Sequence, residues 1–128
     1  MAGASESYHE PLDSLSKKTR DMHRALVSLQ EELEAVDWYQ QRADAASSEA
    51  LRAVLLHNMN EEIEHACMVL EWLRRNHDHF DKQLRTYLFT SEPITEIEEE
   101  EEQGDAESPS PPDERPLART IGSLKKGE

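Results

Sequence analysis

The sequence predicts an all-α protein, an antiparallel two-helix hairpin with a short C-terminal helix that dimerises into a four-helix bundle. Three observations favour this fold. The 128 residues include only four glycines and 5% aromatic residues, a composition typical of helices when Leu, Ala, Glu and Arg are abundant. Two long stretches lack Gly and Pro. Apolar residues in both recur at steps of three and four, the period of an amphipathic helix.

The first helix is expected between residues 12 and 46. Its apolar stripe advances by steps of 4, 3, 4 and 3, through Met22, Leu26, Leu29, Leu33 and Val36. Ser47 and Ser48 follow, and either hydroxyl is a suitable N-cap for a second helix. The prediction is therefore two helices joined by a very short turn.

The second helix is expected from residue 49 to about residue 76, and a shorter third helix from residue 78 to about residue 89. The stripe of the second helix is Leu51, Leu55, Met59, Glu62, Ala66, Val69 and Leu73. One member of this otherwise apolar stripe is a carboxylate, which makes Glu62 a candidate functional residue.

The charge pattern divides the chain into four segments. Residues 1–10 are a flexible N-terminus, and residues 11–92 are the helical hairpin domain. Residues 93–115 form an acidic, proline-rich linker that we expect to be disordered, because it cannot bury enough apolar surface to offset its chain entropy. Residues 116–128 form an apolar, basic C-terminal peptide.

Composition also excludes several classes of protein. The formal net charge of −14 argues against binding to nucleic acid. The longest apolar run, residues 66–70, is far shorter than the roughly 20 residues of a membrane helix. A single cysteine and an N-terminus without a basic, apolar leader suit a cytoplasmic protein.

Three polar residues interrupt the apolar faces in a mutually consistent way. Glu32 lies on a face of the first helix between Leu29 and Val36. Glu62 and His65 are three residues apart, so they project from one side of the second helix. A lone buried carboxylate costs several kcal/mol or becomes protonated, whereas a divalent cation would supply the compensating charge.

A homodimer would double this ligand set. A hairpin of about 80 residues is marginally stable alone, so pairing of two copies is expected. Two copies then supply two Glu and two Glu-x-x-His pairs, which is the ligand set of di-iron carboxylate bundles. Carboxylates with one imidazole fit Fe(II), Mn(II) or Zn(II); iron is favoured because two bridged irons can deliver two electrons to dioxygen.

Three motifs carry a resemblance to a known family. The stretches EELEAVDWY (31–39), EEIEH (61–65) and LRTYLFT (84–90) resemble those of the encapsulated ferritin-like proteins over roughly residues 8–95. The resemblance implies a ferritin-like bundle and a ferroxidase that oxidises Fe(II) to Fe(III) at an inter-subunit di-iron site. Its metal ligands map onto Glu32, Glu62 and His65.

Further roles are implied by the same resemblance. Glu31, Glu34 and Trp38 correspond to the residues through which iron enters, and Tyr39 corresponds to a group near the metal. From the residues alone, Glu31 and Glu34 are equally well explained as a solvated helix face, and Tyr39 as ordinary interface packing. Dimers would assemble into an open decameric ring.

The C-terminal peptide resembles the cargo-loading peptide that docks such proteins inside an encapsulin shell. Its motif TIGSLKK (120–126) presents two apolar anchors, Ile121 and Leu124, around Gly122, with Leu117 upstream. From the residues alone, a frayed terminus is the alternative. The resemblance implies that ferric mineral forms within the encapsulin nanocompartment, so the compartment rather than the protein stores the iron.

Two other functions are compatible with the residues. A non-enzymatic metal sensor or chaperone on the same bundle would bind iron without turnover. A structural adaptor would dimerise without metal and recruit a partner through its tail. The inward Glu62 and His65 argue against the adaptor, because they weaken a bundle that makes no use of them.

Overall fold

The computed structural model describes residues 7–107, with side chains through residue 104, and this part of the chain is helical without strands. A short 3₁₀ helix, η2 (Leu12–Ser14), precedes α1 (Lys17–Ala45) and α2 (Glu49–Asn76). These are followed by α3 (Asp78–Tyr87) and α4 (Ile94–Glu107). The predicted all-α fold class is confirmed. No helix in the described ranges is long and apolar enough to cross a membrane.

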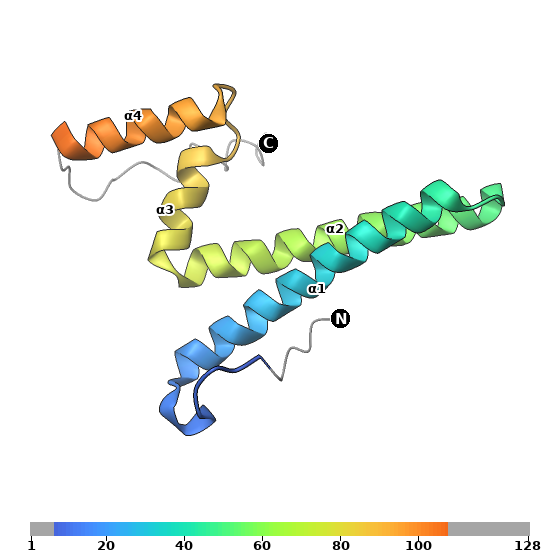
Figure 1. Ribbon diagram of the computed structural model, residues 1–128, viewed down its shortest axis with the longest axis horizontal. Coiled ribbons are helices and arrows are strands. Elements are labelled where there is room, and N and C mark those ends of the chain that lie inside the picture. Colours follow the sequence, from blue (N-terminus) through green and yellow to red (C-terminus); the bar gives the residue numbers. More distant parts are fainter. Residues whose placement is uncertain (1–6, 108–128) are drawn as a thin grey trace, which may run out of the picture. The chain divides into compact units, whose positions relative to one another are not determined.

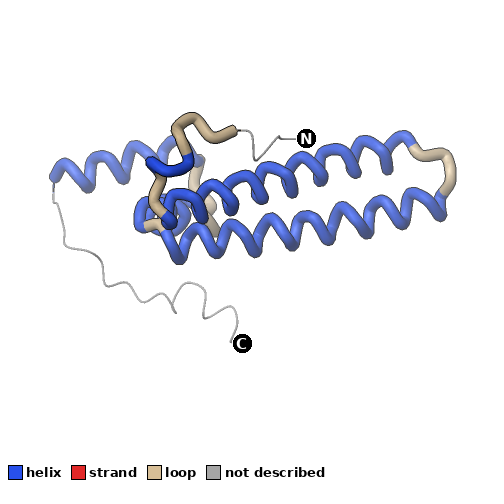
Figure 2. The backbone as a smooth tube through the Cα atoms, turned by 90° about the horizontal axis from the view of Figure 1, so that it is seen from below, coloured by secondary structure: helices blue, strands red, loops and turns tan. Residues whose placement is uncertain are grey.

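The hairpin of α1 and α2 is closed at its turn by side chains that satisfy helix ends. At the turn, the Ser48 hydroxyl accepts the amide N–H of Leu51 at 3.2 Å, whereas the Ser16 hydroxyl, at the other end of α1, accepts that of Thr19 at 3.0 Å. Arg52 donates to the carbonyl oxygens of Ala43 and Ala46, at 2.6 and 2.9 Å. The bonds of Ser48 and Arg52 fix the reversal, and the two long helices run antiparallel from it (Figures 1 and 2).

The hairpin buries little apolar surface by itself. In the described part of the hairpin, the buried apolar residues are Val27, Ala43, Ala66 and Leu73, and of these the Leu73 side chain is fully buried. Leu33 and Leu51, which the sequence placed on the packing stripes, are 54% and 50% exposed. Each helix of a two-helix hairpin has only one neighbour to cover it, so a single chain leaves part of each stripe exposed.

The chain divides into two compact units, residues 1–85 and residues 86–128.

Helix α3 ends at Tyr87, two residues before the predicted position. Phe89 adopts a left-handed backbone with φ of 63°, and the Thr90 hydroxyl donates to the Tyr87 carbonyl at 2.7 Å. This local turn explains the earlier end of the helix.

The expectation that residues 93–115 are disordered is wrong for α4. The Pro93 carbonyl accepts the amide N–H groups of Glu96 and Ile97, at 3.0 and 3.2 Å, which starts the helix. Glu has a good intrinsic helix propensity, and Glu96 in the first turn complements the positive end of the helix dipole. These local terms outweigh the repulsion between neighbouring carboxylates. Residues 108–115 lie outside the described residues.

Candidate metal centre

Three side chains from facing helices meet midway along the hairpin. Glu32 comes from α1, and Glu62 and His65 come from α2. One ligand atom from each lies within 4.8 Å of the others. The His65 Nδ1 atom is 3.5 Å from Glu62 Oε1 and 3.7 Å from Glu32 Oε1. The structure therefore brings together the three residues that the sequence singled out as metal ligands.

The local fold explains this convergence. Glu62 and His65 are three residues apart in a continuous helix, so their side chains share one face of α2. Glu32 reaches them from α1 because the short turn holds the two helices antiparallel. No loop contributes to the cluster, so its geometry depends on rigid helix backbone.

The electrostatics of the cluster favour a cation. The pKa of the Glu32 carboxyl is raised, chiefly because it shares a hydrogen bond with Glu62, and then through burial and the charge of Glu62. His65 opposes this shift, and Glu31 adds to it. Two carboxylates at this separation resist being ionised together. A metal ion between them would remove the repulsion.

The donor set and spacing fit a first-row divalent metal. Two ligand atoms bound about 2.1 Å from a metal lie roughly 3.0–3.4 Å apart, close to the separations around His65 Nδ1. Two carboxylates and one imidazole suit Fe(II), Mn(II) or Zn(II). One chain thus offers three candidate ligands, and the candidate site is open to solvent because the His65 side chain is 46% exposed.

The residues expected at the site of iron entry lie on α1 beside the cluster. Glu31 and Glu34 are half-buried, and the charge of Glu31 makes a small contribution to the raised pKa of Glu32, after those of Glu62 and burial. Trp38 is 41% exposed, whereas Tyr39 is half-buried. Within the described residues, Tyr39 forms no hydrogen bond with the three candidate ligands, and its ring lies near Arg42 instead.

Arg42 is a neighbour of this region that the sequence pattern did not single out. Its guanidinium carbon is 5.8 Å from the centre of the Trp38 ring and 5.5 Å from that of Tyr39. The sequence spacing could have identified it. Arg42 follows Tyr39 by three residues and Trp38 by four, so it lies one helical turn from both rings.

The residues expected to dock on an encapsulin shell belong to the C-terminal peptide. They are Leu117, Ile121, Gly122 and Leu124, and all of them lie outside the described residues.

Comparisons with known proteins agree with the resemblance. The EncFtn-like family model matches residues 7–91. The encapsulated ferritin-like protein of Rhodospirillum rubrum is 59% identical over 98 residues, covering 77% of this chain and 70% of the relative. The encapsulin nanocompartment cargo protein EncC of Myxococcus xanthus is 30% identical over 105 residues, covering 78% of this chain and 81% of the relative.

A solved structure has the same fold. The crystal structure of a protein from Nitrosomonas europaea superposes with a TM-score of 0.67 at 58% sequence identity. The match covers 69% of this chain and 97% of the other.

Proposed function

This chain belongs to the EncFtn-like family, and from that premise we propose that it is a ferroxidase. Its substrate is Fe(II), which it oxidises to Fe(III) at a di-iron site shared by two copies of the chain. The observation that carries the proposal is the convergence of Glu32, Glu62 and His65 within 4.8 Å. The product feeds iron mineralisation and storage inside an encapsulin nanocompartment.

The second copy completes the ligand set. One hairpin supplies one Glu and one Glu-x-x-His pair, and two hairpins related by a two-fold axis supply the four Glu and two His of di-iron bundles. The hairpin also exposes large apolar side chains on both long helices, among them Leu33, Leu51, Ile63 and Met68. Covering these side chains favours dimerisation. The family resemblance implies that such dimers build a decameric ring.

The chain's own residues have separable tasks in this reaction. The carboxylates of Glu32 and Glu62 neutralise the increasing charge as each iron is oxidised. His65 provides a neutral nitrogen donor. Two Fe(II) lose one electron each, and dioxygen takes both electrons with two protons to give hydrogen peroxide. The acidic helix face at Glu31 and Glu34 raises the local concentration of Fe(II).

A non-enzymatic metal sensor or chaperone on the same bundle is the alternative function. It would use the same three ligands but hold iron without turnover. The two functions differ in one observable, which is catalysed oxidation.

The test is aerobic oxidation of Fe(II) by the full-length protein, followed by the absorbance of Fe(III). We expect Glu32→Ala, Glu62→Ala and His65→Ala each to lower the initial rate more than ~10-fold, as loss of groups at metal sites commonly does. Glu64→Ala is the matched control, since it removes an exposed carboxylate from the same helix beside His65. It should keep the wild-type rate.

Two results would contradict the proposal in different ways. Wild-type rates in all three ligand variants would refute the site. Iron binding by the wild-type protein, without oxidation above a no-protein control, would favour the sensor.

Association with an encapsulin shell is tested separately. Deletion of residues 117–128 removes the apolar anchors of the tail, including Ile121 and Leu124. We expect this variant to retain its ferroxidase rate but to lose co-purification with a co-expressed encapsulin. A variant in which Lys125 and Lys126 are replaced by Gln, with the apolar anchors intact, is the control for charge alone. Continued co-purification after the deletion would refute the targeting role.

A further inference from the structure

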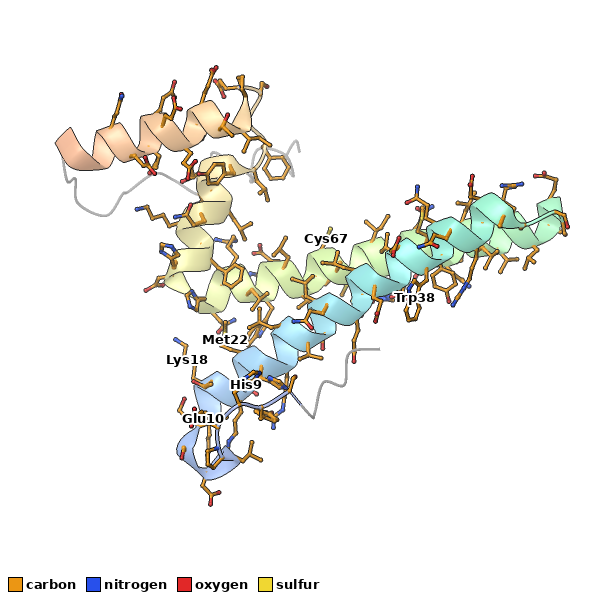
Figure 3. All side chains as sticks on the ribbon, in the orientation of Figure 1. His9, Glu10, Lys18, Met22, Trp38 and Cys67 are labelled. Carbon is orange, nitrogen blue, oxygen red and sulfur yellow. The ribbon has the colours of Figure 1, made fainter. Side chains whose placement is uncertain are left out.

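Arg42 contacts two aromatic rings at once on the surface of α1. Its guanidinium carbon lies 5.8 Å from the Trp38 ring centre and 5.5 Å from the Tyr39 ring centre. Both distances are within the range of about 6 Å over which a guanidinium is attracted to the face of a ring. One planar cation is therefore close enough to be attracted to two neighbouring rings. Figure 3 labels Trp38 on α1.

The position of Arg42 on the helix relates it to the acidic face. Successive residues of an α-helix are about 100° apart, so the 3, 4, 4 spacing of Glu31, Glu34, Trp38 and Arg42 keeps all four within a narrow stripe. We call these four residues the α1 stripe. Trp38 stands between the carboxylates and Arg42. Any reorientation of its ring changes the surroundings of Glu34, one turn away.

Distance separates two ways in which Arg42 can influence this stripe. Arg42 follows Glu34 by eight residues, which is about 12 Å along the axis at 1.5 Å per residue. The Debye length at physiological ionic strength is about 8 Å. The charge of Arg42 is therefore largely screened at Glu34, whereas its contact with the Trp38 ring is direct.

We propose that Arg42 is a positioning residue that holds the Trp38 and Tyr39 rings in place, keeping the approach of Fe(II) to Glu31 and Glu34 open. The proposal rests on the proposed ferroxidase function for its kinetic consequence, but not for the ring contact itself. Arg42 is ten residues from Glu32, about 15 Å along the axis, so it does not touch iron bound at the metal centre.

The ring contact is tested without iron. The chain has two tryptophans, so a Trp72→Phe background leaves Trp38 as the single reporter. We expect Arg42→Gln in this background to change the wavelength of maximum emission and lower the anisotropy of Trp38. Arg42→Lys keeps a cation but loses the planar guanidinium, so its Trp38 emission and anisotropy should lie between those of the reference protein and Arg42→Gln. An unchanged Trp38 signal in Arg42→Gln would overturn the proposal.

The kinetic consequence is a split between KM and kcat. We expect Arg42→Gln to raise the apparent KM for Fe(II) about three-fold and to leave kcat within two-fold, because only the approach is affected. The apparent KM of Arg42→Lys should lie between those of the reference protein and Arg42→Gln. An unchanged KM would overturn the positioning role.

Arg24 provides a matched control for charge. It precedes Glu31 by seven residues on α1, and it pairs with Asp21 at 2.7 Å rather than with a ring. If screening holds, Arg24→Gln keeps both the KM and the Trp38 signal of the reference protein. If both Gln variants lowered the KM, Arg42 would act by repelling Fe(II), and the proposal would be wrong.

Failure of the ferroxidase function is distinguishable from failure of this proposal. If the reference protein oxidises no iron, Co(II) serves as a redox-silent probe that quenches nearby tryptophan emission. Weaker quenching of Trp38 in Arg42→Gln than in Arg24→Gln would support the role of Arg42 in metal access. Equal quenching would overturn it.

Discussion

Two clusters of charged side chains in the hairpin unit differ in whether their carboxylates are paired with cationic side chains. The metal-centre cluster joins Glu32 and Glu62 to a single imidazole, that of His65. The second cluster lies where α2 meets α3, and we call it the corner cluster. Its members are Glu71, Arg74, Arg75, Asp81 and Arg85.

The corner cluster is compensated by guanidinium groups. Arg74 donates two hydrogen bonds of 2.8 Å to the carboxylate of Glu71 and a further bond to Asp81. Arg85 Nε donates to Asp81 Oδ1 at 2.9 Å. Bidentate pairs of this kind are among the strong hydrogen bonds of proteins. The cluster therefore ties the first turn of α3 to the last turn of α2.

The pKa directions follow this difference in compensation. Hydrogen bonds from Arg74 are the main reason that the pKa of Glu71 falls to about 2. Burial raises the pKa of Asp81, but the bonds from Arg85 and Arg74 outweigh it and lower the pKa. The hydrogen bond with Glu62 raises the pKa of Glu32. The same residue type is thus stabilised as an anion at the corner and destabilised at the metal centre.

This contrast separates carboxylates that are already paired with cations from carboxylates that a metal ion would pair. At the corner, each carboxylate already has a cationic partner, and no further ion is required. At the metal centre the chain places two carboxylates beside one imidazole, and within the described residues no arginine or lysine is among the groups that shift the pKa of Glu32. Two carboxylates this close cost stability when both are ionised, and a cation bound between them would remove that cost.

The largest expected effect on stability comes from breaking the corner cluster. Arg74→Met keeps the apolar stem but removes its bonds to Glu71 and Asp81. We expect the free energy of unfolding to fall by about 1–2 kcal/mol at pH 7, since two or three partly exposed ion pairs contribute ~0.5 kcal/mol each. Urea denaturation at one fixed protein concentration measures it.

The loss of stability in Arg74→Met should depend on pH. Because the folded-state pKa of Glu71 is about 2, below its ordinary 4.5, its stabilising contribution is present above pH 4.5 and disappears as the pH falls toward 2. The difference between wild type and Arg74→Met should shrink over that window. Arg75→Met is the matched control, because Arg75 is 69% exposed and bonds only to Glu71 in this cluster. An Arg75→Met loss equal to that of Arg74→Met would show that burial at the corner contributes nothing.

A smaller effect of opposite sign is expected at the metal centre. Glu32→Gln removes one of the two like charges while preserving the shape of the side chain. Because the folded-state pKa of Glu32 is raised, its ionised form destabilises the metal-free protein at neutral pH. Glu32→Gln should therefore stabilise the chelator-treated protein by up to ~1 kcal/mol at pH 7, and this gain should vanish below pH 4.5.

Adding a divalent metal should reverse that order. A ligand that binds the folded state stabilises it by mass action, so Mn(II) should raise the Tm of wild type more than that of Glu32→Gln. Glu64→Gln, which removes an exposed carboxylate from α2, should respond to Mn(II) like wild type. If Glu32→Gln destabilised the metal-free protein, the metal-centre cluster would be a balanced structural feature like the corner.

The sequence predicted the features that depend on local periodicity and short spacing. The predicted ranges of the two long helices agree with the structure within a few residues, apart from the first five residues of the first range, which contain η2 instead. Ser48 caps α2 as expected from its hydroxyl. Glu62 and His65 share a face because a three-residue step in a helix requires it. These outcomes need no knowledge of how distant parts of the chain meet.

One prediction is wrong because competing local terms had to be weighed. The acidic residues of α4 were read as a disordered tether, but helix propensity and the bonds to Pro93 outweigh their repulsion. Hydrophobic periodicity placed Leu33 and Leu51 on packing stripes, but it does not state whether one chain covers them, and in the single hairpin they are 54% and 50% exposed.

The sequence by itself determined the helical class, the hairpin and the identity of the three candidate ligands. Only the tertiary structure decided that Glu32 of α1 meets Glu62 and His65 of α2, and that Arg74 reaches Asp81 across the α2–α3 corner. The physical reason is the sequence separation over which each interaction acts. Backbone hydrogen bonding and side-chain period act within a few residues, whereas the charge balance of a cluster depends on residues that only the packed helices bring together.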